Sequence, residues 1–134
     1  MIVVDTSALI AMIFGEEAAP ALRLRLSAET ERHISAVSVV EFGTVVGGRL
    51  TTQRADVQAL VWRMLADAGL SVAPVDEAQA RLALEARVRF GRGFGAKAGL
   101  NFGDSFAYAL AKALQAPLLF VGEDFRHTDI AAAL

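Results

Sequence analysis

Short apolar runs alternate along the chain with longer segments in which apolar residues recur at helical spacing. The short runs predict strands at Ile2–Val4, His33–Ala36, Leu70–Pro74 and Pro117–Val121. Recurrence at intervals of three and four predicts helices at Ala8–Phe14, Ala18–Ala28, Val39–Leu50, Arg54–Ala68, Glu77–Phe90 and Phe102–Leu114. Strands that alternate with helices indicate an α/β fold with a parallel sheet.

One segment, GRGFGAKAG from Gly91 to Gly99, interrupts this pattern. Its glycines break any helix, and its charged residues, Arg92 and Lys97, are both positive. We therefore expect a mobile loop between the last two helices.

The composition narrows the class of protein. A chain of 134 residues has the size of one domain, here 1–134, and 54% of its residues are hydrophobic, which predicts that some apolar surface faces a partner. The apolar runs are too short to span a membrane, and no basic leader precedes them, so we expect a cytoplasmic protein.

The chain contains no cysteine, so any metal must be held by oxygen or histidine ligands. A net charge of −2 argues against non-specific coating of nucleic acid but leaves a local basic patch open.

Acidic residues follow the predicted strands, where the carboxyl ends of a parallel sheet form its ligand-binding edge. The acids expected at this edge are Asp5, Glu41, Asp104, Glu123 and Asp124. Each has an alternative role at the start of a helix or turn. Asp5 could be a cap, Ser38 to Glu41 a capping box and Asp104 an acid of a first turn, while Glu123 and Asp124 could cap a short final turn. Together, however, crowded carboxylates are unfavourable unless a cation lies among them.

A hard divalent ion meets that requirement, because Mg²⁺ and Mn²⁺ prefer carboxylate oxygens and bind substrate phosphates. Zinc fits less well, since His33 and His127 lack the paired spacing of a histidine metal site. The sequence leaves the number of metal ions open.

Four motifs in order, MIVVDTSAL, SVVEF, LNFGDSFAYALAKAL and GEDFRHTDI, resemble a PIN-domain ribonuclease and, more specifically, the VapC toxins of type II toxin–antitoxin pairs. The resemblance implies a three-layer α/β/α fold around a central parallel sheet of four or five short strands. Because the chain ends at Leu134, soon after the last motif, we expect the edge strand that many relatives carry to be short or missing. It also implies a Mg²⁺-dependent endoribonuclease, with Mn²⁺ as a substitute, that is inhibited by a cognate VapB-type antitoxin.

The resemblance carries site residues over by position. The expected catalytic acids are Asp5, Glu41, Asp104 and Asp124, of which Asp5, Asp104 and Asp124 are the expected metal ligands. Thr6 and Glu123 are expected to be auxiliary, and Glu123 and Asp129 remain alternatives for the fourth acid. A bound metal would neutralise the phosphodiester and activate water, leaving a 5′-phosphate and a 3′-hydroxyl.

Binding of RNA requires positive charge, which Arg87, Arg89, Arg92 and Lys97 supply shortly before Asp104. A solvated helix face is the alternative interpretation of these residues. For Phe90 and Phe94 we expect core packing rather than stacking on bases.

Two other functions remain open on the residues alone: a catalytically silent PIN-like interaction domain and a Mg²⁺-dependent small-molecule phosphohydrolase. The first would be expected to lose some of the acids, and the second should show a phosphate loop or an Asp-x-Asp motif, which the sequence lacks.

The apolar helices at Ala18–Ala28, Val39–Leu50 and Arg54–Ala68 are expected to form a homodimer contact and an antitoxin groove. A charge at Leu60 or Met64 is expected to weaken one of these contacts.

Overall fold

A four-stranded parallel sheet forms the centre of the computed structural model, which describes residues 1–50 and 54–134. The strands are β1 (Ile2–Val4), β2 (Arg32–Ser35), β3 (Ser71–Ala73) and β4 (Leu118–Leu119), in the spatial order β3-β2-β1-β4. Val3 pairs with His33 on one side and with Leu118 on the other, so β1 lies inside the sheet. The predicted strands are therefore confirmed, although β4 is shorter than expected.

The helices are α1 (Thr6–Ile13), α2 (Ala19–Ser27), α3 (Ala36–Leu50), α4 (Arg54–Asp67), α5 (Glu77–Phe90) and α6 (Phe102–Leu114). Each corresponds to a predicted helix. The largest difference is that α3 begins directly after β2, at Ala36 rather than Val39. Ser38 therefore lies inside α3, which excludes the alternative interpretation of Ser38 to Glu41 as a capping box.

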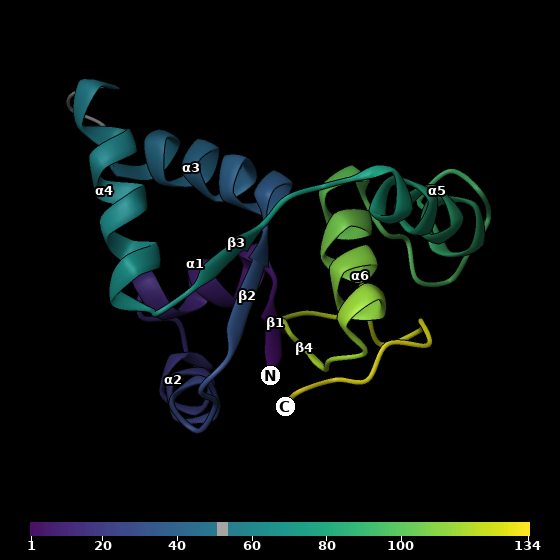
Figure 1. Ribbon diagram of the computed structural model, residues 1–134, viewed down its shortest axis with the longest axis horizontal. Coiled ribbons are helices and arrows are strands. Elements are labelled where there is room, and N and C mark those ends of the chain that lie inside the picture. The colour runs from purple at the N-terminus through teal and green to yellow at the C-terminus, as the bar shows by residue number, and fades with distance from the viewer. Residues whose placement is uncertain (51–53) are drawn as a thin grey trace.

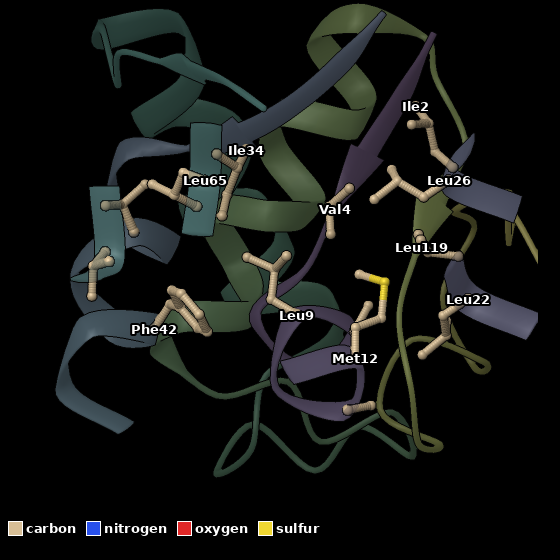
Figure 2. Close-up of a cluster of buried hydrophobic side chains, with 14 of the residues drawn as sticks. Ile2, Val4, Leu9, Met12, Leu22, Leu26, Ile34, Phe42, Leu65 and Leu119 are labelled. Carbon is tan, nitrogen blue, oxygen red and sulfur yellow. The ribbon is translucent and has the colours of Figure 1, made fainter. Parts of the chain in front are cut away.

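Side chains that alternate along the strands divide the core into two layers. Ile2 and Val4 point to the face covered by α1, α2, α3 and α4, where they belong to one buried cluster with Ile34, Leu119 and Phe42, as Figure 2 shows. Val3 points to the opposite face, where it packs with residues of α6 such as Tyr108 and Leu110. Figure 1 shows the sheet between these two groups of helices, which confirms the α/β/α arrangement.

Hydrogen bonds close the base of the glycine-rich loop and extend the edge of the sheet. The Arg92 N–H donates to the Leu100 carbonyl at 2.8 Å, and the Leu100 N–H donates to the Phe90 carbonyl at 2.8 Å. At the outer edge of β4, Leu118 forms a single parallel bridge with Ala132, as expected for a short edge strand. Among the described residues, no helix is both long and apolar enough to cross a membrane.

Candidate active site

Asp5 lies where β1 ends and α1 begins. Its side chain caps α1, because Oδ2 accepts the N–H of Ser7 at 2.9 Å and the hydroxyl of Ser7 at 2.5 Å. The residue is 2% exposed, and its other oxygen, Oδ1, is buried with no hydrogen-bond partner among the described residues. Burial raises the pKa of Asp5, and the nearby charge of Glu41 raises it further. A buried, unpartnered carboxylate oxygen is unfavourable unless a proton or a cation approaches it.

Ser7 connects Asp5 to the chain that follows β4. While its hydroxyl donates to Asp5, the same oxygen accepts the N–H of Val121 at 3.0 Å. Val121 belongs to the segment that leads to Asp124. Ser7 was not among the residues expected at the site, although it stands in the DTS run that contains Asp5 and Thr6.

Asp104 lies in the first turn of α6 and forms a reciprocal capping box with Asn101. Its Oδ2 accepts the Asn101 N–H at 2.9 Å, and its own N–H donates to the Asn101 side chain at 2.8 Å. Asp104 is 7% exposed, and burial is the main cause that raises its pKa to about 7. Three nearby charges add to the rise in pKa, those of Asp5, Asp124 and Glu41. These four carboxyl groups, here called the acid cluster, therefore influence one another at the same edge of the sheet.

Glu41 lies in α3, a helix that packs against α6. Its carboxylate lies against the first turn of α6, because a Cβ built on Gly103 would come within 1.9 Å of Glu41 Oε2. Thr6 adds a second link to α3, since its buried hydroxyl donates to the Ser38 carbonyl at 3.3 Å. Gly103, which stands directly before Asp104, was also not expected at the site.

The three candidates for the fourth acid have different surroundings. Asp124 is exposed after β4, and its charge raises the pKa of Asp104. Glu123 is exposed and pairs with Arg126 at 3.1 Å. Asp129 accepts hydrogen bonds from Tyr108 and Lys112, each at 2.8 Å. Burial alone would raise the pKa of Asp129, but these two donors bring it below its usual value. Asp129 thus fastens the C-terminal segment to α6.

The carboxylate oxygens of the acid cluster are the ligand type that a hard divalent cation prefers. In the structure, however, these side chains are not arranged as a closed coordination shell. Across residues 1–50 and 54–134, no three His, Asp or Glu side chains meet closely enough to hold a metal. Mg²⁺ usually keeps several waters and needs only one or two carboxylates. The buried Asp5 and Asp104, with the free Oδ1 of Asp5, meet that requirement.

The four basic residues expected to bind RNA differ in their contacts. The Arg87 guanidinium donates to the carbonyls of Leu100 and Arg92, and so supports the loop. Arg89 pairs with Glu85 at 3.1 Å. The other two, Arg92 and Lys97, are both exposed on the loop.

The two phenylalanines near the loop also differ. Phe90 is half-buried, and its ring centroid lies 5.8 Å from that of Tyr108, so it packs in the core as expected. The same expectation is wrong for Phe94, which is 59% exposed because it lies in the loop beyond the end of α5. Its ring is 6.0 Å from the Arg87 guanidinium carbon.

The apolar positions predicted to contact a partner are arranged differently from the expectation. Leu60 and Met64 are half-buried and pack against the core on the α1–α4 side. Trp62, on the same helix, is 53% exposed, and Val40 on α3 is 70% exposed. Both line a groove of about 390 Å³ between α3 and α4. Leu60 and Met64 thus serve mainly the protein's own core, and Trp62 is the larger exposed apolar side chain of α4.

Comparison with known proteins agrees with this fold. The family model described as PIN domain matches residues 2–131. Ribonuclease VapC42 of Mycobacterium tuberculosis is 43% identical over 131 residues, which cover 98% of each chain.

Two solved structures are similar in fold. The M. tuberculosis toxin VapC20, whose description is a sarcin–ricin loop cleaving toxin, has a TM-score of 0.76 at 16% identity and covers 98% of this chain and 97% of its own. VapBC2 of Rickettsia felis, bound to a DNA fragment from its promoter, has a TM-score of 0.72 at 16% identity with the same coverage. At such identity these two structures establish the fold alone. By its family match and its 43% identical relative, the chain belongs to the PIN-domain family and, within it, to the VapC ribonucleases.

Proposed function

We propose that this ribonuclease is an endoribonuclease toxin that hydrolyses RNA phosphodiester bonds with Mg²⁺ or Mn²⁺ bound by the acid cluster. The observation that carries the proposal is the buried, unpartnered Oδ1 of Asp5 beside Asp104, whose pKa is raised to about 7. Carboxyl groups whose pKa is raised by burial and by each other are typical of functional sites. We also propose the cytoplasm as its place of action, since an RNA substrate and a newly made antitoxin meet there.

Asp5 and Asp104 are the proposed principal ligands, with Asp124 as the third and Glu41 as a further negative charge beside them. When bound, a divalent ion would offset the charge of the phosphodiester and lower the pKa of a water molecule. The chain supplies the orientation, since the caps of α1 and α6 fix Oδ2 of both aspartates. We propose Asp124 over Asp129 because Tyr108 and Lys112 already occupy the oxygens of Asp129.

A proton must leave the acid cluster when the cation binds. With a pKa of about 7, Asp104 carries a proton in about half of the metal-free molecules at neutral pH. A carboxylate ligand must be deprotonated, so metal affinity should increase as the pH rises through about 7. Calorimetry in buffers of different ionisation enthalpy should accordingly detect proton release when Mn²⁺ binds.

The decisive experiment measures cleavage of purified RNA by the wild type and by Asp5→Asn. The variant should lose activity roughly 100-fold or more, because it removes a ligand charge while an amide oxygen can still accept the Ser7 N–H. EDTA should inactivate the wild type, and added Mn²⁺ should restore it. Asp56→Asn, on the exposed first turn of α4, is a matched control that should keep full activity. Undiminished cleavage by Asp5→Asn, in a preparation free of host nuclease, would refute the metal mechanism.

We further propose that an antitoxin and a second copy of the chain cover exposed apolar surface on α3 and α4. The support is the groove between these helices, which Val40 and Trp62 line. An apolar helix laid into such a groove is a common recognition mode. Static light scattering on the isolated chain tests the homodimer, and co-expression with the neighbouring open reading frame tests the antitoxin.

A further inference from the structure

We propose that Gly103 is a positioning residue for the acid cluster, because its missing side chain leaves the space in which the Glu41 carboxylate lies. The inference rests on the proposed function, since it assumes that the placement of Glu41 matters for metal binding. It concerns a residue that contacts no substrate and acts only through Glu41.

The contact between Gly103 and Glu41 is close. An ideal Cβ on Gly103 would lie 1.9 Å from Oε2, 2.7 Å from Cδ and 3.1 Å from Oε1 of Glu41. Real Cβ atoms essentially never come closer than 3.0 Å to such atoms. Any residue other than glycine therefore requires the Glu41 carboxylate to move.

The backbone does not require glycine at this position. Gly103 lies inside the first turn of α6 and has none of the positive φ values found at Gly93, Gly95 and Gly99 in the preceding loop. Alanine is favoured over glycine in a helix by about 1 kcal/mol. Glycine thus weakens α6 locally. The structure explains its presence by the space that the Glu41 carboxylate needs.

Other glycines of the described chain show that this arrangement is specific. In α3, a Cβ on Gly43 would make an ordinary contact of 3.7 Å with Val61, and one on Gly48 would meet nothing within 4 Å. Gly91 has a close contact, but with the backbone carbonyl of Arg87 at 2.2 Å, which concerns the end of α5. At Gly103 the atom that a Cβ would displace belongs to a carboxylate of the acid cluster.

The size of the displacement follows from the same distances. To move from 1.9 Å to the 3.0 Å limit, Oε2 must shift by at least about 1.1 Å. Functional constellations have to be held within about 0.5 Å of their productive geometry. Removing a group that orients a metal site lowers metal affinity roughly 10- to 100-fold, and we expect a decrease in that range for Gly103→Ala.

The test is a double-mutant cycle with Gly103→Ala, Glu41→Ala and the pair. Mn²⁺ affinity is measured by calorimetry, thermal midpoints are measured in EDTA, and RNA cleavage is recorded alongside. Gly103→Ala alone should lower Mn²⁺ affinity by the stated factor. In the Glu41→Ala background, where no carboxylate occupies the space, the same change should alter Mn²⁺ affinity by less than about twofold.

Thermal stability separates this inference from the proposed function. In EDTA, Gly103→Ala should raise the thermal midpoint more in the Glu41→Ala background than in the wild type, because only the wild type has the clash. The thermal comparison can be made even if the wild type binds no Mn²⁺ and cuts no RNA. Absence of both activities would refute the proposed function but not the contact between Gly103 and Glu41. If Gly103→Ala unfolds the wild type but not the Glu41→Ala protein, the contact is likewise supported.

Gly48→Ala is the matched control, a glycine-to-alanine change in a helix with open space, and should keep wild-type Mn²⁺ affinity. Equal decreases of affinity from Gly103→Ala in both backgrounds would overturn the proposal. So would wild-type affinity and cleavage in Gly103→Ala itself.

Discussion

Replacing Asp104 with asparagine should make the metal-free protein more stable at about pH 8 while abolishing RNA cleavage. The pKa of Asp104 is about 7 in the folded protein, whereas the ordinary value of 3.8 applies to the unfolded chain. Because the folded state binds this proton more tightly than the unfolded chain does, protonated Asp104 adds to the free energy of unfolding, and this contribution is complete below about pH 4. It is lost as the pH rises through about 7, where the folded protein must hold a buried charge.

The magnitude follows from the two pKa values. The difference between 3.8 and about 7 is about three pH units, and each corresponds to about 1.4 kcal/mol, so the wild type should lose at most about 4 kcal/mol of unfolding free energy between about pH 4 and pH 8. Asparagine has nearly the same shape and can still accept the Asn101 N–H, but it cannot ionise. A smaller slope of the same sign should remain in Asp104→Asn, since burial also raises the pKa of Asp5.

The assay is urea unfolding in EDTA at a series of pH values, with a parallel series in Mn²⁺ without EDTA. At a concentration of 100 times its dissociation constant, Mn²⁺ should stabilise the wild type at about pH 8 by about 2.7 kcal/mol and should stabilise Asp104→Asn much less. Asp129→Asn is an informative control with the opposite sign. The pKa of Asp129 lies below its usual value, so this variant should be less stable than the wild type at about pH 8.

Two results would refute the reasoning. The first is a wild-type stability in EDTA that stays constant or increases between about pH 5 and pH 8. The second is an Asp104→Asn protein that is no more stable than the wild type at about pH 8. Either result would mean that Asp104 is not a buried carboxyl group among other acids.

Three further predictions concern the surroundings of the acid cluster. Ser7→Ala should lower Mn²⁺ affinity roughly tenfold, as measured by calorimetry, because Asp5 is then without one of the donors that orient it. Replacing Arg92 and Lys97 by glutamine should reduce the slope of log RNA affinity against log salt by roughly 0.7 for each phosphate that the protein no longer neutralises, and an unchanged slope would exclude the loop from RNA binding. Trp62→Glu should weaken dimerisation or antitoxin binding, measured by light scattering and pull-down, without changing RNA cleavage; unaltered association would place the partner on another surface.

The pattern of the sequence was sufficient for the order of elements and for the edge at which the acids gather. Helix α5 begins and ends where periodicity predicts, because Asp76 caps its start and Gly91 follows its last residue. Asp5 and Asp104 could be placed together because a parallel sheet puts the carboxyl ends of its strands on one side. These features depend on local chemistry and on topology, both of which the sequence contains directly.

Contacts between residues far apart in the chain could not be predicted from the sequence. Whether Asp124 or Asp129 faces the other acids depends on hydrogen bonds from α6 to Asp129, which no spacing in the chain predicts. The orientation of α4 was also ambiguous, because apolar residues surround much of it and successive residues are rotated by about 100°. As a result Leu60 and Met64, which face the core, could not be distinguished from the exposed Trp62.

Capping and metal binding are alternatives for the same aspartates when only the sequence is considered, but the structure shows that a carboxylate can cap a helix with one oxygen and keep the other unpartnered within the described part of the chain. Asp5 uses Oδ2 to cap α1 and keeps Oδ1 unpartnered among the described residues, while Asp104 uses Oδ2 in the capping box of α6. A cap fixes the rotamer of the side chain before any ligand arrives, which reduces the entropy lost on binding. Glu41 has no such cap, since it lies in the body of α3, and its carboxylate is instead accommodated by the space above Gly103. Two helix N-termini and one missing side chain therefore fix Asp5, Asp104 and Glu41 in advance. The exposed Asp124 is the member of the acid cluster that would lose most conformational freedom if the proposed cation bound.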